Sequence, residues 1–318
     1  MGLRHLSLLK EIKGVMPIAI PKRNDRRVEL NSQGFQTAAS LKQAAEEGTN
    51  LAIIASNTGQ HAADALEALE CGMDLLVEKP LSVDAESARS VYEGSKRRNK
   101  KLFVGCVLRC STSLQTFREW LPRIGKVYAV TVECQSFLPT WRPNHPYRQS
   151  YSAKTEEGGV LRDLIHEIDY ATWIFGFPEK IQAHLKNTGR LSIEAEEFAR
   201  LWWETKGGVS VSVCLDYLSK IPRRHVTAFG EKGNLEWDGL VRKTSVAISD
   251  YPKEERVEPD LSAIYKTQLE EWLEACRTQN RATWLATGLE GIRVLSICDA
   301  ARLASETRRE ETVSYLHG

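Results

Sequence analysis

A lysine at the end of an apolar run is the first candidate for chemistry in this chain. The run at residues 73–77 leads directly into Glu78-Lys79-Pro80. Proline fixes its own φ and restricts the residue before it, so Lys79 is held where the predicted strand ends. Open parallel sheets bind their ligands at that end of the strands. That position suits a catalytic cation, although a tripeptide alone is also compatible with an ordinary surface lysine.

A second candidate group lies in one later stretch. Gly158-Gly159 opens a helical pattern that contains Asp163, His166 and Tyr170 at three- and four-residue spacing, which predicts that the three share one helix face. A neutral histidine can take a proton from an alcohol, and a neighbouring carboxylate can orient its ring. The alternative is a helix whose polar side chains are satisfied by their neighbours.

The elements that position Lys79 alternate between strand and helix. We predict strands at residues 18–20, 51–55, 75–77 and 102–107, and helices at residues 40–47, 61–71 and 83–99, the last with Ser82 as its N-cap. This alternation implies βαβ units and a parallel, doubly wound sheet. We therefore predict an α/β fold whose first domain, residues 1–108, is Rossmann-like and binds a dinucleotide.

A different pattern begins at about Arg109. Alternating residues predict antiparallel strands at 127–137, 200–203, 209–217 and 225–229, with one strong helix at 159–175 and further helices at 263–276 and 288–306. We predict that residues 109–318 form an α+β domain with a largely antiparallel, open sheet, which binds substrate and mediates oligomerisation. An open sheet face favours self-association, as a homodimer or a homotetramer.

The composition favours a small-molecule partner. The 318 residues include 43 basic and 42 acidic side chains, and the resulting net charge of +1 gives no field that would attract nucleic acid or an anionic membrane. No signal peptide or membrane span is recognisable. The seven cysteines lack CxxC spacing, so we expect reduced thiols in a cytoplasmic protein and no metal site.

The first ten residues predict the helix that follows a dinucleotide-binding glycine turn. Gly2 could only be the third glycine of such a fingerprint, so we expect the preceding strand and the first two glycines to be missing. The alternative is a chain that simply starts with a helix. After the next predicted strand stand Lys22 and Arg23, which would suit the 2′-phosphate of NADP better than the ribose hydroxyl of NAD. They could also form only a solvated basic turn.

A loop ahead of the helix is rich in aromatic residues, arginine and proline. Tryptophan and tyrosine stack on sugar rings, and arginine can hold a carboxylate or a phosphate. Such a loop favours a sugar acid or a nucleotide-linked sugar as substrate, and a subunit contact is the alternative. The candidate substrate residues are Trp141, Arg142, Tyr147, Arg148 and Tyr151, together with Asp163 and Tyr170.

Three ordered motifs resemble the Gfo/Idh/MocA oxidoreductases. They are Glu78-Lys79-Pro80, the GG-x-L-x-D-x-x-H-x-x-D run at residues 158–169, and Asn57-Thr58-x-x-His61. The resemblance implies an NAD(P)-dependent oxidoreductase acting on a sugar, a sugar acid or a nucleotide sugar. It also implies Lys79 beside the reacting carbon, His166 as general acid or base, and Asp163 on a substrate hydroxyl. Many members place the aspartate four residues before the histidine, where this chain has Arg162.

The same resemblance, which spans nearly the whole chain, implies a set of cofactor contacts. These are Gly2, His5, Ser56, Asn57, His61, Glu78, Lys79 and Arg109, in addition to Lys22 and Arg23. One alternative function is a non-catalytic ligand-binding or regulatory member of the same fold. Another is an N-terminally shortened form of an ordinary enzyme.

Overall fold

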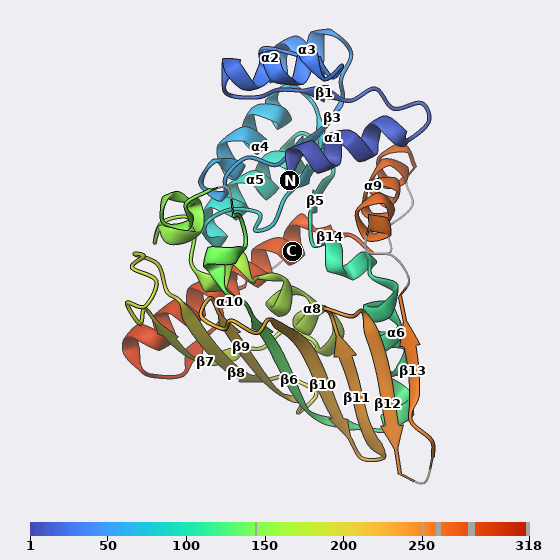
Figure 1. Ribbon diagram of the computed structural model, residues 1–318, viewed down its shortest axis with the longest axis vertical. Helices are drawn as coiled ribbons and strands as arrows, with labels where there is room; N and C mark the ends of the chain where they lie inside the picture. Colours follow the sequence, from blue (N-terminus) through green and yellow to red (C-terminus); the bar gives the residue numbers. More distant parts are fainter. Residues whose placement is uncertain (144, 250, 259–261, 279–283, 316–318) are drawn as a thin grey trace.

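Two large sheets, a separate two-stranded sheet and the helices around them make up the computed structural model, which describes residues 1–143, 145–249, 251–258, 262–278 and 284–315 (Figure 1). The α-helices are α1 (Gly2–Glu11), α2 (Asn24–Ser32), α3 (Leu41–Glu46), α4 (His61–Glu70), α5 (Ala85–Arg97), α6 (Thr112–Trp120), α7 (Val160–Asp163), α8 (His166–Phe175), α9 (Ser262–Arg277) and α10 (Gly288–Thr307). The strands are β1 (Ile18–Ala19), β2 (Gln36–Thr37), β3 (Leu51–Ile54), β4 (Asp74–Val77), β5 (Leu102–Val104), β6 (Val127–Gln135), β7 (Lys180–Lys186), β8 (Phe198–Glu204), β9 (Ser210–Asp216), β10 (Arg223–Gly230), β11 (Gly233–Asp238), β12 (Lys243–Ile248), β13 (Glu254–Val257), β14 (Ala286–Thr287) and β15 (Glu311–Thr312).

The first sheet is built from short apolar strands in the order β14-β5-β4-β3, and β3, β4 and β5 are parallel. Successive side chains of a strand point to opposite faces. Leu75 and Val77 accordingly pack with the core that includes α4 and α5, whereas Leu76 packs with α9 and α1. The predicted Rossmann-like α/β fold is confirmed. Among the described residues, β1 and β2 pair in parallel with each other and with no other strand.

Two details of this domain correct the sequence prediction. Helix α5 begins after Asp84, whose Oδ1 accepts a hydrogen bond from the backbone N of Ser87 at 2.7 Å, so Asp84 and not Ser82 is the N-cap. Helix α2 was not predicted, because its sequence has no apolar stripe at helical spacing. In the structure Leu30 is accordingly its only buried residue.

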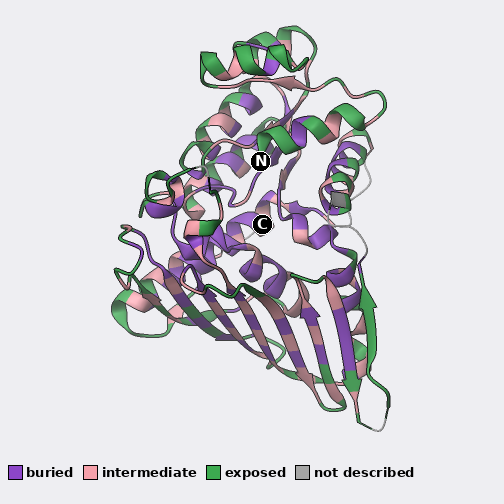
Figure 2. Ribbon diagram, viewed as in Figure 1, coloured by how far each residue is buried: buried purple, intermediate pink, exposed green. Residues whose placement is uncertain are grey.

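The second sheet has nine strands in the order β13-β12-β11-β10-β6-β9-β8-β7-β15. Only the pair β6 and β9 is parallel among its described ladders, which confirms the largely antiparallel sheet. Buried and more exposed residues alternate along its strands (Figure 2). Helices α8 and α10 lie against one face. The other face carries Trp202, which is 39% exposed, and Tyr128, which is 56% exposed.

The C-terminal segment serves both sheets. Strand β14 pairs antiparallel with β5, with Ala286 opposite Val104, so it extends the first sheet. Helix α9 packs against α1, and α10 runs between α5 and β7. The boundary at residues 108 and 109 stays a prediction, but the segment after residue 262 does not belong to the second sheet alone.

The single helix predicted over residues 159–175 is wrong, because the structure divides it into α7 and α8. The break lies at Leu164, which has φ −98° and ψ 32°. The backbone N of Glu167 donates to the carbonyl of Leu164 at 3.3 Å, one residue short of the α-helical partner. The carbonyl of Asp163 is thereby left to accept a different hydrogen bond.

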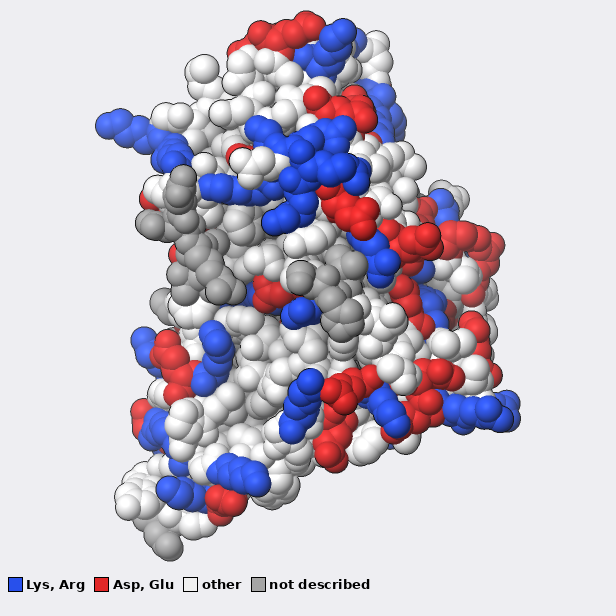
Figure 3. Space-filling view, turned by 180° about the vertical axis from the view of Figure 1, so that it is seen from behind, with Lys and Arg blue, Asp and Glu red and all other residues white. Residues whose placement is uncertain are grey.

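The surface shows no single sign of charge on the face seen in Figure 3. Lysine and arginine side chains gather over the upper part of that view, and aspartate and glutamate side chains lie beside them. No group of three or more His, Cys, Asp or Glu in the described residues could hold a metal ion. None of the helices within the described ranges is long and apolar enough to cross a membrane. The seven cysteines are all free thiols.

Candidate active site

Lys79 leaves the end of β4 and reaches the broken helix of the second domain. Its half-buried side chain donates a hydrogen bond from Nζ to the carbonyl of Asp163 at 2.6 Å. That carbonyl is available because the helix ladder is interrupted there. Arg162, the preceding residue, is also buried and donates from Nε to the carbonyl of Val83 at 2.7 Å. Two neighbouring residues of α7 thus join the second domain to the first, close to Lys79.

Glu78 holds the lysine in place from the N-terminal side. Its Oε1 lies 2.6 Å from Nε2 of His5, and both side chains are buried. Burial would raise the pKa of the Glu78 carboxyl, but the bond to His5 and the charges of His5 and Lys79 outweigh it and lower that pKa. A Cβ on Gly105 would come within 3.2 Å of the Cα, Cδ and Oε2 atoms of Glu78, so glycine leaves room for this carboxylate.

His61 fixes the loop from the other side. Its Nδ1 lies 2.7 Å from the carbonyl oxygen of Pro80, and its Nε2 lies 3.1 Å from that of Ser56. Burial lowers the pKa of His61, although the two carbonyl contacts oppose the shift. A neutral imidazole has one N–H, and the shorter contact assigns it to Nδ1. His61 therefore attaches the start of α4 to the loop that carries Lys79.

His166 opens α8 beside the lysine. Its Nδ1 is buried and has no hydrogen-bond partner. Burial lowers the pKa of His166 well below its ordinary value, and the positive charges of Lys79 and Arg224 lower it further. The imidazole is therefore neutral near pH 7 and can accept a proton. Arg224 itself is paired through Nε with the buried Glu167 at 2.8 Å.

Asp163 is oriented by a tyrosine that the sequence did not single out. Tyr217 Oη donates to Asp163 Oδ2 at 2.6 Å, and burial followed by the charge of Asp163 raises the pKa of the phenol well above its ordinary value. Tyr217 directly follows β9, a strand that was predicted. Its role depends on a contact with a residue 54 positions away, for which no local pattern exists. The ring of Trp141 packs edge-on against Tyr217 with the centroids 5.3 Å apart.

Tyr151 and Arg142 extend this cluster from the aromatic loop. Arg142 donates from Nη2 to Tyr151 Oη at 3.3 Å, and its guanidinium lies 5.1 Å from the centre of the tyrosine ring. Burial raises the pKa of Tyr151, as does the charge of Asp163, while Lys79 and Arg142 act against the shift. The phenol is therefore close enough to sense both the lysine and the aspartate.

Other predicted substrate residues lie elsewhere. Tyr147 Oη and Arg148 Nε both donate to the carbonyl of Leu191, at 3.1 Å and 3.2 Å, so these side chains fasten the loop. Tyr170 is fully buried and packs edge-on against Trp237 with the centroids 5.6 Å apart. The prediction for Tyr170 is corrected, because its complete burial leaves no surface for a ligand.

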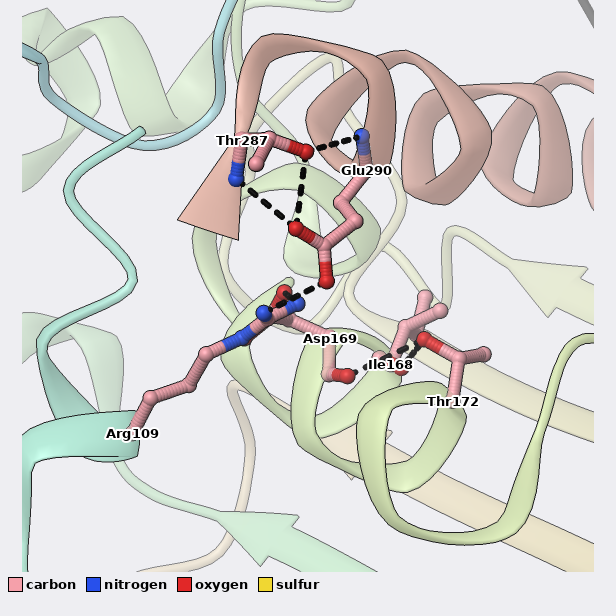
Figure 4. A network of polar contacts seen from close by, with 6 residues as sticks. All are labelled: Arg109, Ile168, Asp169, Thr172, Thr287 and Glu290. Atoms are coloured by element: carbon pink, nitrogen blue, oxygen red, sulfur yellow. Dashed lines mark hydrogen bonds and ion pairs between the residues drawn. The ribbon is translucent and has the colours of Figure 1, made fainter. Parts of the chain in front are cut away.

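Arg109 requires a similar correction. The guanidinium is 1% exposed, binds Asp169 through Nε at 3.0 Å and Nη2 at 2.7 Å, and binds Glu290 through Nη1 at 2.8 Å (Figure 4). Glu290 also forms the capping box of α10 with Thr287. Every strong contact of the guanidinium is therefore made inside the protein. Arg109 joins α8 and α10 and presents no surface to a cofactor.

The remaining predicted cofactor residues surround the ends of β1 and β3. A Cβ on Gly2 would lie 3.9 Å from that of Ala55, which places the start of α1 beside the end of β3. No side chain caps α1, and such a helix start suits a phosphate. Ser56 Oγ is buried without a partner next to the exposed Asn57. These groups fit the hydroxyl and phosphate oxygens of a dinucleotide.

The two basic residues after β1 differ from each other. Lys22 Nζ is held by Asp64 at 2.8 Å and by Gln60 at 3.1 Å. The side chain of Arg23 is 75% exposed, and its closest carboxylate is that of Asp25 at 3.6 Å. Arg23 is thus the freer cation of the pair.

Comparisons with known proteins agree with this arrangement. Residues 1–106 match the sequence model described as "Oxidoreductase family, NAD-binding Rossmann fold", and residues 115–236 match the GFO/IDH/MocA C-terminal domain. An uncharacterized oxidoreductase of Streptococcus pneumoniae serotype 4 is 22% identical over 169 residues, which cover 52% of this chain and 44% of that protein. The D-glucoside 3-dehydrogenase of Escherichia coli K12 is 28% identical over 131 residues, which cover 39% of this chain and 36% of that enzyme. These alignments thus span less than half the length of either relative.

A solved structure of levoglucosan dehydrogenase in complex with NADH has a TM-score of 0.86 to this chain. The two are 15% identical, and the superposition covers 99% of this chain and 95% of that one. At this identity the likeness establishes the shared fold.

Proposed function

Because the chain belongs to the Gfo/Idh/MocA oxidoreductase family, we propose that it transfers a hydride between a nicotinamide cofactor and a sugar-like alcohol or carbonyl compound. The observation that carries this proposal is the contact of Lys79 with the carbonyl of Asp163, beside the neutral His166. It brings a cation from the end of a Rossmann strand to a proton acceptor from the second domain. Alcohol oxidation is accelerated when a proton acceptor and a cation both reach the hydroxyl oxygen of the reacting carbon.

The three side chains have separate roles. In the oxidation direction His166 takes the proton of the substrate hydroxyl. The Lys79 ammonium stabilises the negative charge that develops on that oxygen, and the C–O bond becomes a carbonyl. The bound nicotinamide supplies the acceptor for the hydride that leaves the same carbon. Asp163, held by Tyr217, accepts a hydrogen bond from a neighbouring substrate hydroxyl and so orients the sugar.

A sugar-like substrate is supported by the residues around this cluster. Trp141 and Tyr151 offer aromatic faces beside Asp163 and Lys79, and such faces stack on sugar rings. Two similar proteins are named as a D-glucoside 3-dehydrogenase and a levoglucosan dehydrogenase, which act on sugars.

For the cofactor, the dinucleotide would be held by the start of α1 at Gly2, by Ser56 and by Asn57. We favour NADP over NAD, because the exposed Arg23 offers a bidentate donor for a 2′-phosphate. Arg23→Gln should weaken NADPH binding about tenfold, as expected when one charge-assisted contact is lost, and leave NADH binding nearly unchanged. The measurement is quenching of tryptophan fluorescence.

The open face of the nine-stranded sheet supports self-association. Its aromatic side chains, Trp202 and Tyr128, remain partly exposed in the single chain. We propose a homodimer or homotetramer that buries them. Trp202→Glu should lower the molar mass measured by light scattering after size-exclusion chromatography, and an unchanged mass would contradict this interface.

One experiment tests the activity itself. The chain is mixed with NADPH or NADH, binding is followed by tryptophan fluorescence, and turnover of a panel of sugars and polyols is followed by absorbance at the nicotinamide band. We expect dinucleotide binding and sugar turnover, the latter lowered by at least about 10²-fold in Lys79→Ala and in His166→Asn. Failure to bind either dinucleotide would overturn the proposal. Binding of dinucleotide and sugar without any turnover would instead establish the ligand-binding alternative.

A further inference from the structure

The two arginines of the aromatic loop have different partners. Arg148 donates to the carbonyl of Leu191, away from Lys79 and Asp163, and lies 5.0 Å from the centre of the Tyr147 ring. Arg142 is exposed and, among the described residues, its guanidinium makes its hydrogen bond, at 3.3 Å, and its ring contact with Tyr151. No ion pair found within the described residues involves Arg142. Its guanidinium therefore keeps donors free for a ligand.

Arg142 is placed beside the reacting groups by its neighbours. Tyr151, to which it bonds, senses the charges of Lys79 and Asp163 as well. The adjacent Trp141 donates from Nε1 to Ser136 Oγ at 3.0 Å and packs against Tyr217. Since Tyr217 is the partner of Asp163, the segment that carries Arg142 is anchored to the catalytic cluster from two sides.

The loop itself carries no acidic residue. Residues 136–155 contain two arginines, a lysine and a histidine, but no aspartate or glutamate, and the lysine, Lys154, is paired with Glu157. A small hollow of about 10 Å³ beside Arg142 is lined by Leu138, Trp141, Arg142, His145, Tyr147, Ser150 and Ser152. A guanidinium presents a planar fork that matches a carboxylate. One free guanidinium with one phenol also matches a single negative charge better than the two of a phosphate ester.

We propose that the substrate is a sugar acid, and that Arg142 binds its carboxylate while Lys79 and His166 act on a hydroxyl-bearing carbon of the same molecule. This inference rests on the proposed oxidoreductase function and names the substrate class of that site. Arg142 is the specificity-determining residue, and Arg148 shapes the loop without contacting the acid group.

The test compares substrates that differ only in charge. Glucuronic acid and galacturonic acid are each paired with their methyl esters, and kcat/KM is measured for every compound with the NADP-loaded and NAD-loaded protein. A charge-assisted contact predicts that acids exceed their esters by about 10- to 100-fold in kcat/KM. Arg142→Gln should remove this ratio, and Arg142→Lys should restore part of it. Arg148→Gln, the matched control on the same loop, should keep the ratio.

Three results would overturn the inference. They are equal kcat/KM for acid and ester in the unsubstituted protein, an acid-to-ester ratio that survives in Arg142→Gln, and a preference for a phosphorylated sugar over the acids. If no compound is turned over, the proposed function fails separately, and calorimetric titration with the same acids and esters decides the inference. Tighter binding of the acids that disappears in Arg142→Gln supports carboxylate recognition, and equal binding refutes it.

Discussion

Two neighbouring strands of the first sheet are each followed by a basic residue that lies near the broken helix of the second domain. The two residues differ in how far their side chains are buried and paired with carboxylates. Arg109, after β5, is enclosed with Asp169 and Glu290, and its donors are taken up by their carboxylates. Lys79, after β4, is half-buried and meets a backbone carbonyl beside a histidine with an unpaired Nδ1. The fully paired cluster holds α8 and α10 to the segment that follows β5. The incompletely paired cluster keeps its charge and its proton acceptor available.

The largest effect is expected from breaking the paired cluster. Arg109→Met leaves Asp169 buried without its counter-charge, which should lower the free energy of unfolding by about 3–5 kcal/mol. Arg118→Met is the matched control, because Arg118 stacks on the same Trp173 ring, at 4.6 Å against 5.5 Å for Arg109. Losing that stacking alone should cost about 0.5–1 kcal/mol. Urea unfolding measures both, and equal losses would mean that the carboxylate pairs do not hold α8 and α10 in place.

Breaking the other cluster should change chemistry far more than stability. Lys79→Met should lower kcat/KM by about 10²- to 10³-fold, as when a preorganised donor to a developing oxyanion is removed. Its free energy of unfolding should fall by less than about 1.5 kcal/mol, for the lost hydrogen bond to Asp163.

Lys101→Met is the control for that variant, since Lys101 also donates to backbone carbonyls, those of Ala275 and Thr278, but away from the site. It should lose comparable stability and keep the wild-type kcat/KM. A similar loss of activity in both variants would mean that Lys79 acts only through folding.

Glu78 is intermediate between the two clusters, because it is buried and paired, like Arg109, but directly precedes Lys79. Its pKa in the folded protein is lowered, so its carboxylate contributes stability above the ordinary carboxyl pKa of 4.5, and that stability is lost as the pH falls through the lowered value. Glu78→Gln should reduce the free energy of unfolding at pH 7 by about 1.5–3 kcal/mol and flatten its decline in acid. Glu254→Gln, at an exposed pair with Arg123, should change neither quantity appreciably. Parallel acid profiles for Glu78→Gln and the unsubstituted protein would contradict this role.

The smallest expected effect is a shift in the pH dependence of kcat/KM, which tests the electrostatic coupling between Lys79 and His166. Because the pKa of His166 is lowered, kcat/KM for oxidation should stay level as the pH falls to about 6.5, the ordinary histidine value, and decline only below it. Removing the neighbouring cation in Lys79→Met favours the charged imidazole, so the acid limb of the residual activity should move to higher pH. The limb should stay in place in Lys101→Met. A limb that does not move in Lys79→Met would show that the two groups are not coupled.

Local patterns in the sequence were sufficient to predict most of the helices and strands around the site, and to single out Lys79 and His166. The apolar run before Lys79 and the helical spacing around His166 predicted both positions, since strand and helix periods depend on neighbours in the chain. The break at Leu164 could not be predicted in this way. It is stabilised by the Nζ of Lys79, which belongs to another domain and takes the carbonyl that the helix would have used.

The same limit explains the residues that were assigned wrongly or overlooked. Arg109 and Tyr170 have the residue types of a binding site, and only the packing of α8 against Trp237 and α10 shows that they are enclosed. Tyr217 was overlooked because its partner, Asp163, is distant in sequence. Contacts between residues far apart in the chain, rather than secondary structure, decided these three cases.

The pairing of Ala286 with Val104 also bears on how the chain is made. A ribosome releases β3, β4 and β5 early, and N-terminal units generally fold while synthesis continues. The edge of β5 nevertheless stays unpaired for as long as residues 105–285 are being synthesised, and free strand edges are templates for aggregation. The nascent first sheet is thus completed only when nearly the whole polypeptide has emerged, so the second domain must be translated before the first is protected.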